Sequence, residues 1–142
     1  MKSIKPALKL FLNLAKIQAV MSRRFDSGLG GLGFNEFVIL FQLSQAGEGK
    51  LRRVDLAEKI GLTASGVTRI LLPMEKVGLI KREVNEYDAR VSYVTIAPGG
   101  KRRLAEAMER AELLAEEVLS SFKKKEVEEL GAALVKLSQR VK

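Results

Sequence analysis

The sequence predicts a mainly α-helical fold with a small β-wing: a winged helix-turn-helix lobe between N- and C-terminal dimerisation helices. Residues 56–96 carry, in order, the patterns of a helix, a tight turn, a second helix and a hairpin with a charged tip. Apolar side chains recur at helical spacing before and after this stretch. We therefore expect three parts: 1–34, an N-terminal dimerisation helix and Gly-rich connector; 35–97, the winged lobe; and 98–142, C-terminal dimerisation helices.

Composition narrows the chemistry that this chain can perform. Its 142 residues carry 25 Lys and Arg against 17 Asp and Glu, a formal net charge of +8, and no Cys or His. Disulfides, thiolate or imidazole metal sites and His-based acid–base catalysis are therefore excluded. The excess of positive charge favours a polyanionic partner, either nucleic acid or an anionic membrane surface. The alternative is that these charges only make the surface soluble. We expect no metal, no cofactor and no enzymatic activity.

The N-terminal segment 3–25 is predicted to form an amphipathic helix. Ile4, Leu8 and Phe11 share one face of it, and the whole apolar arc is broader than one small lobe needs, which indicates a partner. Charged residues interrupt it too often for a membrane span or a signal peptide, so we expect a soluble, cytoplasmic protein without membrane contact. Residues 27–33 (SGLGGLG) lack the spacing of a phosphate-binding loop and predict a flexible connector.

Local signals divide the remainder of the chain. Asn35 is expected to cap a helix that runs to about Gln45. Pro98 is expected in the first turn of a long helix that ends near Phe122. The other predicted elements are helices over 53–60, 64–78 and 126–140, and a two-stranded hairpin formed by 80–84 and 91–96.

The turn between the helices 53–60 and 64–78 has the residue types of a helix-turn-helix. Ala57 is small, which allows the helices to approach, and Gly61 suits the left-handed conformation of a tight turn. Thr63 is expected to cap the second helix, and Leu62 to pack beneath the turn. The side chains expected to fix the angle between the helices are Leu56, Ile60, Val67 and Ile70.

Polar residues on the second helix and in the hairpin tip suggest contacts with DNA. Ser65 and Thr68 can bond a phosphate or a base edge, and Arg69 can pair with guanine. At the tip, Arg90 can enter a minor groove, with Asp88 orienting its guanidinium. The alternatives are solvated helix residues and a surface ion pair. The predicted DNA-binding residues are Thr63, Ser65, Thr68, Arg69, Asp88 and Arg90.

These segments together resemble the MarR (multiple antibiotic resistance regulator) family. The matching motifs are DLAE at 55–58, VTR at 67–69, EKVGLI at 75–80 and DAR at 88–90, and the resemblance covers essentially the whole chain. It implies a homodimer with intertwined terminal helices and repression of target genes, often relieved by a small aromatic or anionic effector. It also implies that Ser65, Thr68 and Arg69 contact the major groove, and that Arg90, supported by Asp88, contacts the minor groove.

Two residues depart from the family pattern. Pro73 falls inside the second helix, where it removes the hydrogen bond to the carbonyl of Arg69 and is expected to kink the helix. Ala97 stands where a capping Thr is usual, a loss of about 1 kcal/mol.

The apolar stripes of the C-terminal helices predict the assembly. Most of these residues would be exposed in a monomer, which marks an interface, although purely intramolecular packing is the alternative. The stripes consist of Leu104, Met108, Ala111, Leu114, Ala115, Val118 and Leu119, and of Val127, Leu130, Ala133, Leu134 and Leu137.

The sequence thus predicts a sequence-specific transcriptional regulator that binds double-stranded DNA at a pseudo-palindromic operator as a homodimer. The resemblance implies that this regulator is a repressor whose action a small ligand relieves. The alternative is a non-catalytic winged-helix module with an architectural or protein-binding role. For the effector, Lys16, Arg23 or Arg24 could meet a carboxylate between the dimer helices and the lobe, although phosphate steering or solvation explains these cations equally well.

Overall fold

The computed structural model describes residues 3–84, 87–88 and 91–141, and its elements confirm the predicted fold class. Several helices differ from their predicted bounds. The first runs from Pro6 to Gly28 rather than over 3–25, the helix predicted over 64–78 ends at Lys76, and the last two are separated by a break between Val118 and Lys124. In chain order the elements are α1 (Pro6–Gly28), α2 (Phe34–Gln45), β1 (Lys50–Arg52), α3 (Arg53–Ile60), α4 (Ala64–Lys76), β2 (Ile80–Val84), β3 (Ser92–Ile96), α5 (Pro98–Val118) and α6 (Lys124–Ser138).

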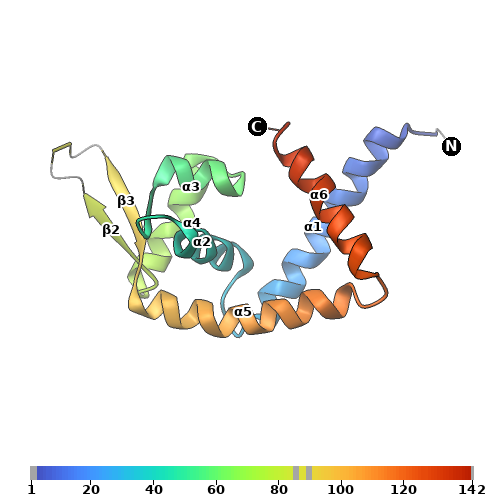
Figure 1. Ribbon diagram of the computed structural model, residues 1–142. Helices are drawn as coiled ribbons and strands as arrows, with labels where there is room; N and C mark the ends of the chain where they lie inside the picture. Colours follow the sequence, from blue (N-terminus) through green and yellow to red (C-terminus); the bar gives the residue numbers. More distant parts are fainter. Residues whose placement is uncertain (1–2, 85–86, 89–90, 142) are drawn as a thin grey trace.

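The chain consists of a lobe and an arm that are connected along α5. The lobe, formed by α2, α3, α4 and the sheet, lies at one end of α5, whereas α1 and α6 rise from the other end as the arm (Figure 1). No helix in the part of the chain that the structure describes has both the length and the apolar character to span a membrane.

One hydrophobic core holds the lobe together, and α5 contributes to it as far as Ala111. Leu104, Ala107 and Ala111 of α5 are buried in this core. The expectation that most residues of the two C-terminal apolar stripes are exposed in a single chain is therefore wrong. Leu104 and Ala111 are buried because this part of α5 covers the lobe, and only Leu130, Ala133 and Leu134 are exposed, the other stripe residues being half-buried. The largest fully buried side chains are Leu32, Ile39, Leu40, Leu43, Leu56, Met74, Ile80, Val67 and Val94.

The sheet has three antiparallel strands in the order β1-β3-β2, rather than the two predicted. Val94 in β3 lies opposite Leu51 of β1 on one side and opposite Arg82 of β2 on the other. β1 has only three residues, and two of them are basic, so its sequence lacks the apolar alternation that predicts a strand. Pairing with β3, a tertiary interaction, creates this strand.

The connector between α1 and α2 is an ordered turn. Leu29 and Leu32 are buried, with exposed fractions of 3% and 1%, so the expectation of a merely flexible connector is wrong. Asn35 is not the cap of α2. Instead, the Phe34 N–H donates to Oδ1 of Asp26 and the Gly33 N–H to Oε1 of Glu36, both at 2.7 Å. These two carboxylates satisfy donors that the start of α2 leaves unpaired.

The start of α5 approaches the turn between α4 and β2 so closely that it requires glycine. Ala97, the N-cap, makes no side-chain capping bond, as predicted, but its N–H donates to the carbonyl of Leu79 at 3.0 Å. A Cβ atom at Gly100 would overlap that same carbonyl, and one at Gly99 would lie 2.9 Å from the carbonyl oxygen of Gly78. Contact of backbone against backbone thus positions α5 on the lobe.

Gly100→Ala should lower the free energy of unfolding by about 1–3 kcal/mol, because the methyl group must displace α5 from the backbone of Leu79. Gly47→Ala is the control, since a Cβ at Gly47 meets nothing within 4 Å and the backbone there has no positive φ. Urea unfolding at one protein concentration measures both variants. Equal stability of the two variants would contradict the close approach.

Candidate nucleic-acid interface

The turn between α3 and α4 has the predicted geometry. Gly61 is left-handed, with φ 74° and ψ 26°, and Thr63 Oγ1 accepts a hydrogen bond of 3.0 Å from the Gly66 N–H, which confirms the cap. Leu62, however, is 39% exposed, so the prediction that it packs beneath the turn is wrong. The buried side chains of Ala57 and Val67 already occupy the contact between the helices, which leaves Leu62 on the outside.

The helix α4 has one buried and one exposed face. Val67, Leu71 and Met74 are buried in the core at helical spacing, whereas Ser65 and Arg69 are exposed. Pro73 lies inside α4, which continues to Lys76. The kink expected at Pro73 stays a prediction, and the turn that carries the exposed polar residues precedes it.

Thr68 is engaged within the protein. Its hydroxyl donates to the carbonyl of Ala64 at 3.0 Å and accepts a hydrogen bond of 2.9 Å from Nη1 of Arg53. A hydroxyl group has one hydrogen and two lone pairs, so only one acceptor position remains for an outside partner. Arg53 is not among the predicted site residues, because a contact between residues fifteen apart has no local sequence signal.

Ser65 and Arg69 are the predicted residues most available to an outside partner. The Ser65 hydroxyl lies 3.3 Å from that of Thr63, and both side chains are exposed. Within the described part of the chain, no carboxylate forms an ion pair with Arg69. These residues therefore form an exposed patch of hydroxyl groups and one guanidinium at the start of α4.

The wing is the hairpin formed by β2 and β3, and the structure describes its tip only in part. Asp88 is half-buried, and its carbonyl accepts a hydrogen bond of 3.0 Å from the Val91 N–H, while Tyr87 is 95% exposed. Arg90 lies outside the described residues, so the expected support of Arg90 by Asp88 stays a prediction.

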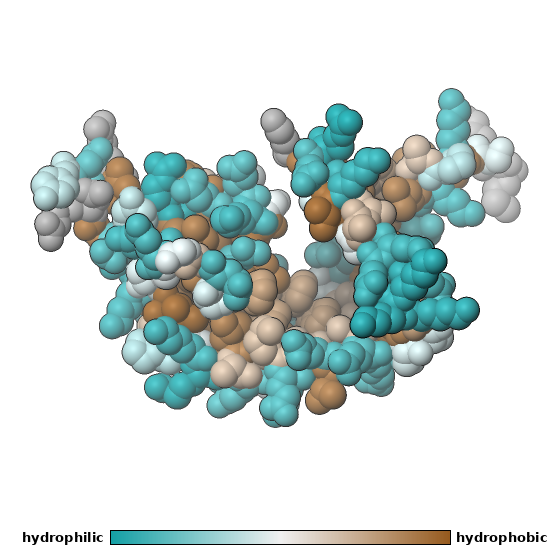
Figure 2. All heavy atoms as spheres, viewed as in Figure 1, coloured by the Kyte–Doolittle hydropathy of each residue, from teal (hydrophilic) through white to brown (hydrophobic). Residues whose placement is uncertain are grey.

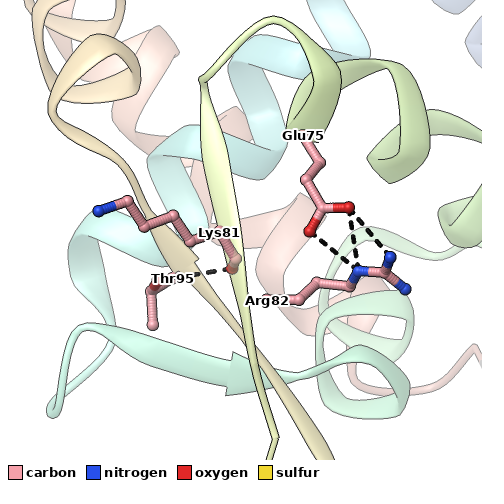
Figure 3. A network of polar contacts seen from close by, with 4 residues as sticks. All are labelled: Glu75, Lys81, Arg82 and Thr95. Atoms are coloured by element: carbon pink, nitrogen blue, oxygen red, sulfur yellow. Dashed lines mark hydrogen bonds and ion pairs between the residues drawn. The ribbon is translucent and has the colours of Figure 1, made fainter.

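A bidentate ion pair connects the wing to α4 (Figure 3). Nε of Arg82 in β2 lies 3.2 and 3.0 Å from the two carboxylate oxygens of Glu75, and Nη2 lies 3.0 Å from Oε1. The hydrogen bonds from Arg82 lower the pKa of the Glu75 carboxyl and raise that of the guanidinium. The pair therefore joins the wing strand to the end of the helix whose start carries Ser65 and Arg69.

A second ion pair lies at the start of α3. Nε of Arg52 donates to Oδ2 of Asp55 at 3.0 Å, and this hydrogen bond lowers the pKa of Asp55. Across the sheet, Nζ of Lys50 lies 3.5 Å from Oε1 of Glu83 and 4.7 Å from the centre of the Tyr93 ring.

Among the residues that the structure describes, no group of three or more acidic side chains could hold a metal ion.

Comparison with known proteins points to one family. The model of the MarR family matches residues 34–92. Over 100 residues the chain is 29% identical to the HTH-type transcriptional repressor YetL of Bacillus subtilis, a match that spans 69% of this chain but only 60% of YetL.

Solved structures agree over nearly the full length. The crystal structure of the transcriptional regulator BldR from Sulfolobus solfataricus is 33% identical, with a TM-score of 0.86, over 99% of this chain and 100% of BldR. A MarR family transcriptional regulator from Streptomyces coelicolor, solved in complex with DNA, shares the fold at 18% identity, with a TM-score of 0.81 over 100% of this chain and 92% of that chain.

The ion pair between wing and helix predicts a pH dependence of stability. Because folding depresses the pKa of Glu75, the pair stabilises the fold above the unfolded-state pKa of Glu75, and this contribution is lost as the pH falls through the folded-state pKa. Urea unfolding should therefore show Glu75→Gln less stable than wild type near neutral pH, with the difference disappearing in acid. Glu58→Gln, which also removes one carboxylate but at an exposed position on α3, is the matched control. A pH-independent difference for Glu75→Gln would contradict the pair.

Proposed function

The chain belongs to the MarR family, and we propose that it is a DNA-binding transcriptional repressor that binds a pseudo-palindromic operator as a homodimer and is relieved by a small ligand. The observation that carries the proposal is the exposed start of α4, where Ser65 and Arg69 stand on a helix whose opposite face is buried. A helix held in this way can enter a major groove without distorting the lobe. A DNA-binding role accords with the cytoplasmic location expected above, which stays a prediction.

The chemistry of this face favours DNA over a protein partner. Arg69 can form two hydrogen bonds with guanine, and the short side chains of Ser65 and Thr63 allow the backbone to approach a phosphate. An architectural or protein-binding winged helix would instead need an apolar or acidic face here. Asp88 and Arg90 are proposed to act at the adjacent minor groove.

The apolar surface of the arm supports a homodimer. Neither α1 nor α6 contains a buried residue in the single chain. An apolar surface of this extent normally marks an interface, and a twofold dimer would place two recognition helices about 34 Å apart, one turn of DNA. The exposed apolar side chains of the arm are Ile4, Leu8, Leu10, Phe11, Leu12, Ile17, Leu130, Leu134 and Val135.

The proposed effector, a small aromatic or anionic compound, has a suitable place between lobe and arm. The face drawn in Figure 2 is hollowed there, and a cleft of about 1090 Å³ runs from Ile60 and Leu62 of the lobe to Gln139 and Val141 after α6. A ligand in this cleft would change the angle between lobe and arm, and hence the spacing of the two recognition helices. Lys16, Arg23 and Arg24, exposed on α1, stay predicted effector residues.

Selection of bound duplexes from a random DNA pool tests the proposed function. The expected product is an inverted repeat whose half-site centres are one helical turn apart. A pool without enrichment would contradict DNA recognition, and enrichment of a single half-site would contradict the dimer.

Arg69→Ala should cost about 1–3 kcal/mol of specific binding and relax the preference at one base pair in each half-site. Lys101→Ala removes an equal charge from an exposed position on α5 and is the control. Fluorescence anisotropy with the selected operator and with single-base variants of it measures both proteins. If Arg69→Ala weakens the binding of every sequence equally, Arg69 contacts only phosphate.

Ending the chain at Lys123 should abolish the dimer, because it removes the whole of α6, on which Leu130 and Leu134 are exposed. The lobe should remain folded, since α6 contributes no buried residue to its core. Without the second subunit, operator affinity should fall by a factor of about 100 or more. Sedimentation equilibrium at micromolar concentration measures the assembly. A truncated chain that is still a dimer would contradict the role of α6.

A further inference from the structure

A small cleft lies between α4 and the wing, and its polar lining is basic. Its volume is about 60 Å³, and Arg53, Thr68, Arg82 and Ser92 contribute its polar groups. Arg53 and Ser92 also line a neighbouring cleft of about 150 Å³ between the start of α3 and the start of β3. Arg53 therefore occupies the position where α3, α4 and the wing meet.

Arg53 differs from the other two arginines of these clefts in its partner. Arg82 is paired with Glu75 and Arg52 with Asp55, each with an N–O distance of 3.0 Å. Among the described residues, Arg53 forms no ion pair, and its Nη1 donates a hydrogen bond of 2.9 Å to the neutral hydroxyl of Thr68. The positive charge of Arg53 is thus held in a defined place, and no carboxylate in the part of the chain that the structure describes pairs with it.

The geometry of DNA places a phosphate strand at this cleft. If α4 occupies a major groove and the wing the adjacent minor groove, the sugar-phosphate strand that separates the two grooves must pass between α4 and the wing. Arginine is well suited to phosphate, because its planar fork of N–H groups matches the phosphate oxygens.

We propose that Arg53 binds the DNA phosphate between the major and minor grooves, and that Thr68 is a positioning residue for Arg53 rather than a reader of bases. This inference rests on the proposed function. Thr68 donates its own hydrogen to Ala64 and presents a lone pair to Nη1, which fixes the guanidinium before DNA arrives. Ordering a long side chain in advance reduces the entropy lost on binding.

The test compares salt dependence and base preference for the selected operator and an unrelated duplex. Arg53→Gln should weaken the binding of both by the same factor, and should reduce the slope of log affinity against log salt by about 2 per dimer, since each subunit loses one phosphate contact. Lys101→Gln, with the same change of charge away from the clefts, should keep the wild-type slope.

The Thr68 variants separate positioning from base reading. Thr68→Val removes the hydroxyl acceptor but keeps the shape of the side chain. It should lower the affinity for both duplexes by the same factor, and by less than Arg53→Gln does. The base preference and the slope of log affinity against log salt should stay unchanged. Thr68→Ser, which keeps the hydroxyl, should restore wild-type affinity. Unchanged urea midpoints would show that these surface variants remain folded.

The outcomes distinguish failure of the inference about Arg53 and Thr68 from failure of the proposed DNA-binding function. An Arg53→Gln protein with the wild-type salt slope would overturn the phosphate contact while the proposed function stands. A changed base preference in Thr68→Val would overturn its positioning role. A wild-type protein that binds no duplex would overturn both this inference and the proposed function.

Discussion

The packing of α3 against α4 across the Gly61 turn is the contact on which the rest of the interface depends. Ala57 and Val67 are buried where the helices meet, with exposed fractions of 4% and 0%. Since helical residues repeat every 3.6 positions, a helix that buries Val67 must expose Ser65 and Arg69. The orientation of the polar face is therefore set by the core of the lobe and not by the polar residues themselves.

Polar contacts then fix the neighbours of α4. Exposed ion pairs contribute little to the free energy of unfolding, so the main effect of these contacts is to orient the elements that they join. The Arg82–Glu75 pair holds β2 to the end of α4, and the Arg53–Thr68 bond holds α3 to its first half. α3, α4 and the wing are thus joined into one unit.

Local signals made the fold predictable, and tertiary contacts limited what could be predicted of the site. Gly61 and Thr63 act within a few residues of themselves, so their roles in the turn could be inferred from spacing and are confirmed. β1 exists only because it pairs with β3, and no pattern within Lys50–Arg52 indicates it. For the same reason the hydrogen bond between Thr68 and Arg53 could not be predicted from the sequence.

The proposed function requires α4 and the wing of each subunit to bind adjacent grooves as one unit, twice in a symmetric dimer. Hydroxyl-radical footprinting on the selected operator measures this arrangement, because it reports protection of each sugar along both strands. We expect two equivalent protected regions about one helical turn apart, each extending from the major groove across the intervening strand into the neighbouring minor groove. A single protected region, or protection that stops at the major groove, would contradict it.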